Sequence, residues 1–121
     1  MATILLIDDD EAFRRMLRRA LQRVGYDVVE ASDGRAGLRA LSDARVDLVI
    51  TDIIMPEMDG LETIRALRQS HPELKIIAMS GGGRAKPEGY LATAKLFGTA
   101  AVFTKPFDNE ELFAAIEDAL R

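Results

Sequence analysis

Five short apolar segments alternate with five segments of helical periodicity along the chain. The apolar segments, most of them rich in Val, Ile and Leu, predict strands over 3–7, 27–31, 46–51, 74–79 and 100–104. In the segments that follow them, apolar residues recur at steps of three and four, as on the buried face of a helix. These segments predict helices over 11–24, 34–44, 60–70, 87–97 and 109–120. Strands that alternate with helices predict an α/β fold, with one parallel sheet and helices on both of its faces.

The first predicted helix has two clearly different faces. Asp10 is placed to accept hydrogen bonds from the free N–H groups at its start, and Gly25 is suited to end it. The predicted inward stripe consists of Phe13, Met16, Leu17, Ala20, Leu21 and Val24. The opposite face carries Arg14, Arg15, Arg18, Arg19 and Arg23. We interpret this face as solvated surface, and docking of an acidic partner at Arg14 and Arg15 is the alternative.

Aspartates precede three of the other four predicted helices as well. Asp33 and Asp108 are suited to cap the second and the last helix, and Asp59 with Glu62 forms a capping-box pattern before the third. Segment 27–31 is more polar than the first strand, so we expect it at an edge of the sheet.

Length and composition are those of one ordinary globular domain. The chain has 121 residues, of which 48% are hydrophobic and 30% charged, so we expect a single domain over residues 1–121. The net charge of −4 argues against direct binding of nucleic acid, and no apolar run approaches the ~20 residues that span a membrane. The absence of cysteine excludes a disulfide framework and Cys-based zinc sites. We therefore expect a cytoplasmic protein that contacts neither nucleic acid nor membrane.

Polar side chains follow four of the five predicted strands. Asp8 and Asp9 follow the first strand, Asp52 the third, Ser80 the fourth and Lys105 the fifth. The carboxyl ends of parallel strands share one edge of the sheet, and open α/β folds bind ligands there. We therefore expect three carboxylates, one hydroxyl and one ammonium group to converge at this edge.

Three neighbouring carboxylates repel one another unless positive charge offsets them. Two unit charges ~4 Å apart cost about 4 kcal/mol at an effective dielectric constant of about 20. Lys105 supplies one positive charge, and a divalent cation would supply two more. Oxygen ligands without His or Cys favour Mg²⁺, or Mn²⁺, over zinc, and Mg²⁺ commonly binds carboxylates together with a phosphate. The set of residues therefore predicts a phosphoryl site.

No general base is placed to activate water at this site, because the only histidine, His71, lies in a predicted turn. Asp52 itself is therefore the favoured nucleophile, and its product would be a labile acyl phosphate. Such a product suits a transient mark on a signalling module. Two alternatives are a small Mg²⁺-dependent hydrolase that uses an aspartyl-phosphate and an FMN carrier. The three acids after the first strand argue against the FMN carrier.

Four motifs carry a resemblance to a known family: LLIDDD at 5–10, TDIIMPEMDG at 51–60, MSGG at 79–82 and TKPF at 104–107. With these motifs in this order, the whole chain resembles the receiver domain of two-component response regulators. It is similar to the chemotaxis regulators, and we expect a stand-alone domain. The resemblance implies a flavodoxin-like (βα)5 three-layer sandwich, whose five-stranded parallel sheet has the order 2-1-3-4-5.

The resemblance also implies a role for each residue of the predicted site. Asp52 would be the phospho-acceptor and a metal ligand, Asp9 a direct Mg²⁺ ligand and Asp8 a ligand through water. The backbone carbonyl of Ile54 would complete the protein's share of the metal shell. Ser80 would move to hold the phosphoryl group.

Lys105 would be the counter-ion of the phosphate, and the Lys105–Pro106 peptide bond would be cis. The resemblance implies that the phosphoryl donor is a phosphohistidine on a sensor histidine kinase or a histidine phosphotransfer protein. A downstream target protein, whose identity the sequence does not indicate, would recognise the phosphorylated state. A phosphorylation-dependent homodimer through the fourth helix, the fifth strand and the last helix is left open.

Two features depart from the family pattern. Many receiver domains carry an aromatic residue three positions before the lysine, where this chain has Val102. A switch that couples the serine to an inward-turning aromatic is therefore not expected, and alternation aims the neighbouring Phe103 at the opposite face. The segment from Ser80 to Lys105 is also longer than is common, and we place the extra length within 81–89.

Overall fold

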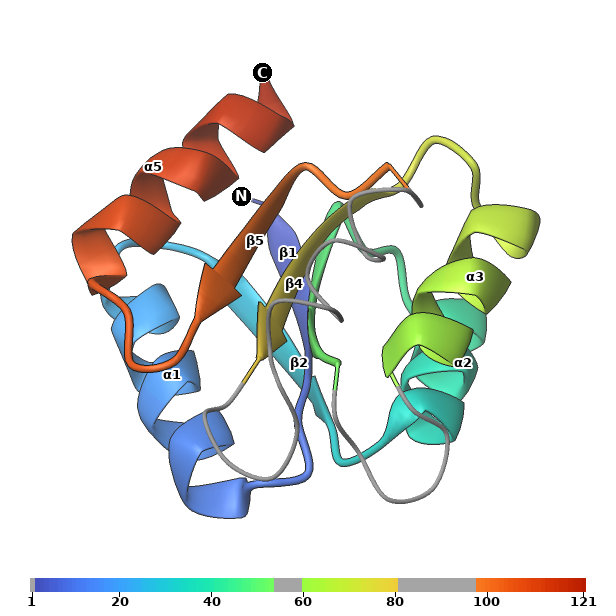
Figure 1. The fold of residues 1–121 in the computed structure, drawn as a ribbon, viewed down its shortest axis with the longest axis horizontal. Helices are drawn as coiled ribbons and strands as arrows, with labels where there is room; N and C mark the ends of the chain where they lie inside the picture. The colour runs from blue at the N-terminus through green and yellow to red at the C-terminus, as the bar shows by residue number, and fades with distance from the viewer. Residues whose placement is uncertain (1, 54–59, 81–97) are drawn as a thin grey trace.

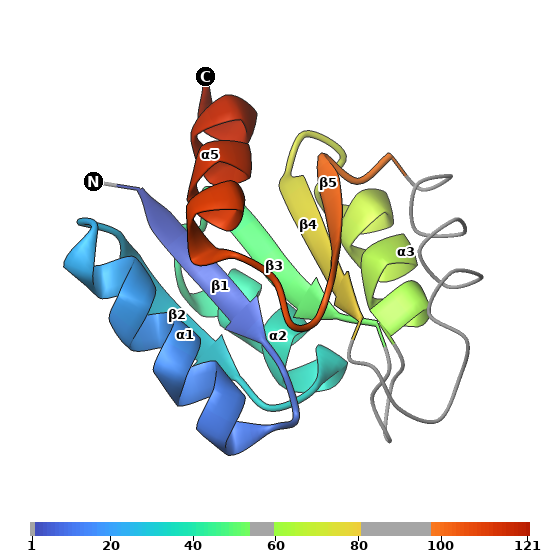
Figure 2. The same ribbon diagram turned by 60° about the vertical axis from the view of Figure 1, so that its left-hand side comes forward.

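The computed structural model describes residues 2–53, 60–80 and 98–121 as a layered α/β fold (Figure 1). Its five-stranded sheet is parallel and has the predicted order, β2-β1-β3-β4-β5. The strands are β1 (Thr3–Ile7), β2 (Asp27–Ala31), β3 (Leu48–Asp52), β4 (Lys75–Ser80) and β5 (Ala101–Thr104). The more polar β2 lies at one edge of the sheet, as predicted (Figure 2). The predicted helix over 87–97 and the predicted cap Asp59 lie outside the described residues.

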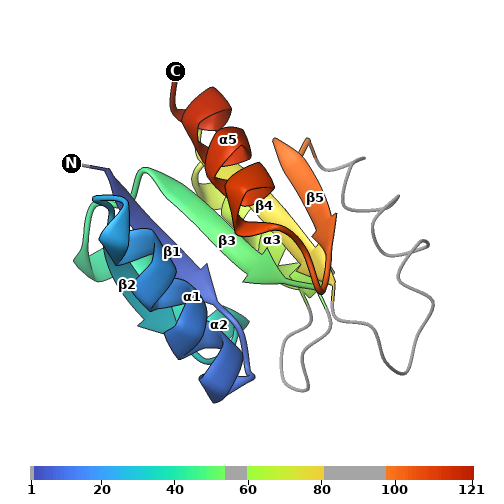
Figure 3. The same cartoon turned by 90° about the vertical axis from the view of Figure 1, so that its left-hand side faces the viewer.

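Helices cover both faces of the sheet. On one face lie α1 (Glu11–Arg23) and α5 (Asn109–Leu120), and on the other lie α2 (Gly34–Asp43) and α3 (Gly60–Ser70). Successive strand residues alternate between the two layers, so that Ile4 packs with α1 and α5 while Leu5 packs with α3. This arrangement confirms the predicted three-layer sandwich (Figure 3). No helix in the described ranges is long and apolar enough to cross a membrane.

Aspartate side chains cap α1, α2 and α5 as predicted. Asp10 accepts a hydrogen bond from the backbone N–H of Phe13 at 3.1 Å, and Asp33 accepts one from Ala36 at 2.8 Å. Asp108 is the N-cap of α5. Each cap satisfies a backbone donor that has no partner within its own helix.

Asp33→Ala is expected to lower the free energy of unfolding by about 1 kcal/mol, since the loss of an N-cap commonly costs about 0.5–2 kcal/mol. Urea denaturation followed by circular dichroism measures the change. Ser32→Ala is the matched control, because Ser32 is exposed and precedes the cap. An equal loss of stability in both variants would show that the Asp33 side chain is not the stabilising group.

The inward stripe of α1 is narrower than the sequence pattern predicts. Met16 and Val24 are expected on the buried face, but they are 56% and 51% exposed. The contact of α1 with the sheet runs along Phe13, Leu17 and Leu21, at steps of four. The prediction is wrong because α1 covers the edge of the sheet at β1 and β2, where one line of side chains meets the strands.

Candidate functional site

Parallel pairing brings the carboxyl ends of the strands to one edge of the sheet. Ile7 of β1 lies opposite Thr51 of β3, and Ser80 of β4 lies opposite Thr104 of β5. The residues at and just after these positions therefore meet at the same edge. This is the edge at which the sequence predicts the functional site.

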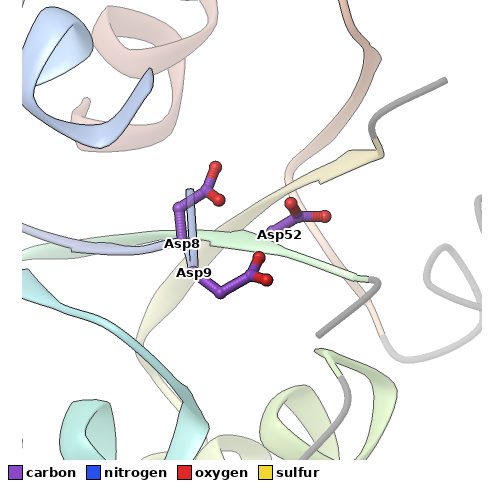
Figure 4. A group of neighbouring side chains, drawn as sticks. All are labelled: Asp8, Asp9 and Asp52. Atoms are coloured by element: carbon purple, nitrogen blue, oxygen red, sulfur yellow. The ribbon is translucent and has the colours of Figure 1, made fainter. Parts of the chain in front are cut away.

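Asp8, Asp9 and Asp52 form an acidic cluster at this edge (Figure 4). One carboxylate oxygen from each residue lies within 4.8 Å of the other two. Asp8 is fully buried and Asp52 is 5% exposed, whereas Asp9 is exposed to solvent. Carboxylate oxygens at this spacing are suited to a hard divalent cation. The three acids predicted to converge are therefore brought together by the fold.

Lys105 joins the acidic cluster from the end of β5. Its Nζ donates hydrogen bonds to Asp8 Oδ2 at 2.7 Å and to Asp52 Oδ2 at 3.2 Å. Its backbone N–H donates to the carbonyl oxygen of Ser80 at 2.8 Å, which holds the chain in place where it leaves β5. The Lys105–Pro106 peptide bond is cis, as predicted.

Burial and charge act in opposite directions on the Asp8–Lys105 pair. Burial raises the pKa of Asp8, and the hydrogen bonds from Lys105 and from the N–H of Asp10 offset this only in part. Burial would lower the pKa of Lys105, but the hydrogen bond to Asp8 and the charge of Asp52 outweigh burial and raise it. Lys105 is therefore protonated at neutral pH. Further positive charge nearby would stabilise the ionised form of Asp8, which burial disfavours.

Phe13 covers the lysine on one side. The Lys105 Nζ lies 3.9 Å from the centroid of the Phe13 ring, which is a cation–π contact. Phe13 also meets Phe107 edge to face, with the ring centroids 6.1 Å apart. The sequence pattern assigns Phe13 only to the helix stripe. Its place in the first turn after the acidic cluster was the one available sign of a contact with the site.

Ser80 lies at the same edge but does not bind the acids. Its side chain is fully buried, and its Oγ has no hydrogen-bond partner in the part of the chain that the structure describes. A buried hydroxyl without a partner is costly, so this position fits a site that another hydrogen-bonding group completes. The carbonyl of Ile54, a predicted metal ligand, lies outside the described residues.

Arg14 belongs to the site and not to a solvated surface. Its side chain is 13% exposed, and its Nη1 donates a hydrogen bond to the carbonyl oxygen of Asp8 at 2.7 Å. Its Nε donates to Glu30 of β2 at 2.9 Å, and Arg18 also pairs with Glu30. The predicted solvated face is therefore wrong for Arg14, because β2 places an acid beside it. Arg15, which is 57% exposed, lies in solvent as predicted.

The profile of the response regulator receiver domain family matches residues 4–117 of this chain. The chain belongs to this family. Among its relatives, the transcriptional regulatory protein GlrR of Escherichia coli is 39% identical over 119 residues, which cover 98% of this chain and 26% of GlrR. The transcriptional regulatory protein YrkP of Bacillus subtilis is 41% identical over 120 residues, which cover 98% of this chain and 49% of YrkP. This receiver domain thus spans about a quarter of the first relative and about half of the second.

Solved receiver domains have the same fold. A response regulator receiver domain protein from Clostridium thermocellum has a TM-score of 0.91 and 29% identity, over 99% of this chain and 94% of its own. The chemotaxis protein CheY4 of Vibrio cholerae has a TM-score of 0.86 and 31% identity, over 99% of both chains. These similarities confirm the predicted fold and family. Receiver domains of response regulators are phosphorylatable signalling modules that generally use Mg²⁺ and interact with sensor kinases and downstream effectors.

Proposed function

We propose that Asp52 of this receiver domain accepts a phosphoryl group from a phosphohistidine donor. The observation that carries the proposal is the Lys105 amine, held between Asp8 and Asp52 beside the acidic cluster. Asp52 is the last residue of β3, the central strand, and its carboxylate faces the amine. A nucleophilic carboxylate, a neutralising lysine and acids for a cation are the groups that phosphoryl transfer requires.

The acidic cluster fits a hard divalent cation. Three carboxylates without His or Cys favour Mg²⁺, and Mn²⁺ suits the same ligands. The raised pKa of Asp8 reflects a buried negative charge that such a cation would stabilise. In the proposed site Asp9, Asp52 and the Ile54 carbonyl are direct ligands, and Asp8 binds through water. When bound, the cation would neutralise charge on the incoming phosphoryl group.

The proposed transfer forms one bond and breaks another. A carboxylate oxygen of Asp52 attacks the phosphorus atom while the bond from phosphorus to the histidine nitrogen breaks. The bonding electron pair leaves with the imidazole, and an acyl phosphate forms on Asp52. Lys105 has three N–H donors and would turn part of its contact from Asp8 to the phosphoryl oxygens. The buried Ser80 Oγ, which has no partner among the described residues, would supply another donor.

The proposed donor is a sensor histidine kinase or a histidine phosphotransfer protein, and the exchange would take place in the cytoplasm. A downstream protein would recognise the phosphorylated surface, and a second copy of the domain is a further candidate for that role. The likeness to a protein named sensor kinase CckA of Brucella abortus supports the assignment of a sensor histidine kinase as the donor. The two are 37% identical over 121 residues, which cover 12% of that protein.

The acyl-phosphate mimic BeF₃⁻ is expected to bind this receiver domain only when both Mg²⁺ and Asp52 are present. The mimic coordinates a carboxylate oxygen, so the wild type should bind it stoichiometrically and Asp52→Ala should not. Fluorine NMR of the bound mimic measures the difference. Asp43→Ala, which removes an exposed acid of α2, is the control and should bind like the wild type. Binding to Asp52→Ala with wild-type affinity would refute Asp52 as the acceptor.

A further inference from the structure

Arg14 links α1 to the backbone of the acidic cluster. Its Nη1 donates to the Asp8 carbonyl oxygen at 2.7 Å, and its Nε donates to Glu30 Oε1 at 2.9 Å. The side chains of Arg14 and Glu30 are 13% and 20% exposed, so both are largely withdrawn from water. Both hydrogen bonds come from the same rigid, planar guanidinium group. The bond to Glu30 therefore fixes the direction of the Nη1 that donates to Asp8.

The carbonyl group that Arg14 binds belongs to the peptide unit between Asp8 and Asp9. Because this unit is planar, the position of the Asp8 oxygen determines the direction in which the chain enters Asp9. Asp9 is exposed, so its carboxylate depends on the backbone for its position. Asp8 is also held through its side chain, by the amine of Lys105 and the N–H of Asp10.

We infer that Arg14 is a positioning residue for cation binding. Held by Glu30, it orients the Asp8–Asp9 peptide unit so that the carboxylates of both residues reach the cation. Arg18 pairs with the other carboxylate oxygen of Glu30 and keeps that side chain in place. The inference rests on the Mg²⁺ site of the proposed function.

Charge and position predict opposite effects for the loss of Arg14. The positive charge of Arg14 repels a cation, so removal of the charge alone would tighten Mg²⁺ binding. Removal of the hydrogen bond releases the Asp8–Asp9 peptide unit, and groups that orient metal ligands commonly contribute about 10–100-fold in affinity. We therefore expect Arg14→Met to bind Mg²⁺ at least about tenfold more weakly than the wild type.

Calorimetric titration of the metal-free chain with Mg²⁺ tests this inference. Arg15→Met is the matched control, because Arg15 is the next residue, is 57% exposed and pairs with Glu11 at the surface. Its affinity should stay within about twofold of the wild type, since exposed pairs contribute little. Arg14→Lys keeps the charge but loses the fork, so its loss of affinity reflects position alone, and we expect it to bind Mg²⁺ no more tightly than Arg14→Met. Glu30→Gln should also weaken binding, because Arg14 loses its orienting partner and a nearby negative charge is lost.

The backbone itself offers a second measurement, independent of the cation. In the metal-free protein, the amide resonance of Asp9 should shift in Arg14→Met and stay in place in Arg15→Met. Circular dichroism at the titration temperature identifies the folded variants, and Arg14→Lys, which keeps the charge, decides the test if Arg14→Met does not fold. A wild type that binds no Mg²⁺ would overturn the proposed function. If the wild type binds Mg²⁺ no more tightly than folded Arg14→Met, the positioning role of Arg14 is overturned and the proposed function is not.

Discussion

Asp52→Asn is expected to abolish phosphorylation of this receiver domain. The amide lacks the nucleophilic carboxylate oxygen, so no acyl phosphate forms. The variant should stay folded, because Asn has the same shape and its oxygen still accepts a hydrogen bond from Lys105, which lies 3.2 Å from Asp52 Oδ2. Incubation with a radiolabelled phosphohistidine donor, followed by counting of the labelled protein, measures the loss. The wild type should take up label and the variant should stay at background.

Asp43→Asn is the control for this experiment, since it removes an exposed carboxylate of α2 and should leave labelling unchanged. Labelling of Asp52→Asn at the wild-type rate would place the acceptor elsewhere. The same assay separates a switch from the hydrolase alternative. A switch takes up one phosphoryl group per acceptor and stops, whereas sustained release of phosphate from a phosphomonoester would favour the hydrolase.

The position of the site follows from the alternating pattern of the chain. Once the strands are known to be parallel, Asp8, Asp52 and Lys105 must approach one edge of the sheet. Topology does not determine which acid the lysine approaches more closely. Its Nζ lies 2.7 Å from Asp8 and 3.2 Å from Asp52, with the Phe13 ring on another side. Those distances depend on side-chain packing, which the pattern of the sequence does not contain.

Prediction from the sequence failed where two elements meet. Steps of three and four identify the buried face of a helix but not its width, so the pattern places Met16 in the core although it is 56% exposed. The same pattern places Arg14 in solvent, because it shares a helix face with Arg15. Only the packing of α1 beside β2 brings Glu30 within 2.9 Å of it. A single sequence gives no sign of this partner, because Glu30 lies on the next strand.

Alternation along β5 was predicted correctly. Val102 packs with the cluster on the side of α3, and Phe103 packs with the cluster on the side of α1 and α5. The Phe103 ring lies 5.4 Å from Phe107, which in turn meets Phe13 beside the lysine. These rings lie on the α1 side of the sheet, whereas the position of the usual switch aromatic is held by the smaller Val102. Val102 has no aromatic ring, so this domain does not transmit its signal through an inward-turning ring at that position.

Lys105→Met is expected to destabilise the metal-free domain and to tighten its binding of Mg²⁺. Loss of the amine leaves the fully buried Asp8 and the nearly buried Asp52 without the charge between them, and such losses cost about 3–5 kcal/mol. Mg²⁺ binding strengthens because the cation no longer meets a positive charge on the same carboxylates. Phosphoryl transfer should fall about 100-fold, since the amine also neutralises the phosphoryl oxygens.

Urea denaturation with and without Mg²⁺, calorimetric titration and labelling rates measure these three effects. Lys75→Met is the control, because Lys75 is exposed at the start of β4, at the opposite end of the strand from the site. A ligand that binds only the folded state stabilises it by RT ln(1 + L/Kd), where L is the free ligand concentration, so tighter binding gives more stabilisation at the same ligand concentration. Mg²⁺ should therefore restore more stability to Lys105→Met than it adds to the wild type. If Lys105→Met were as stable as Lys75→Met without the cation, or bound Mg²⁺ more weakly than the wild type, the amine would not be the counter-ion of the acids.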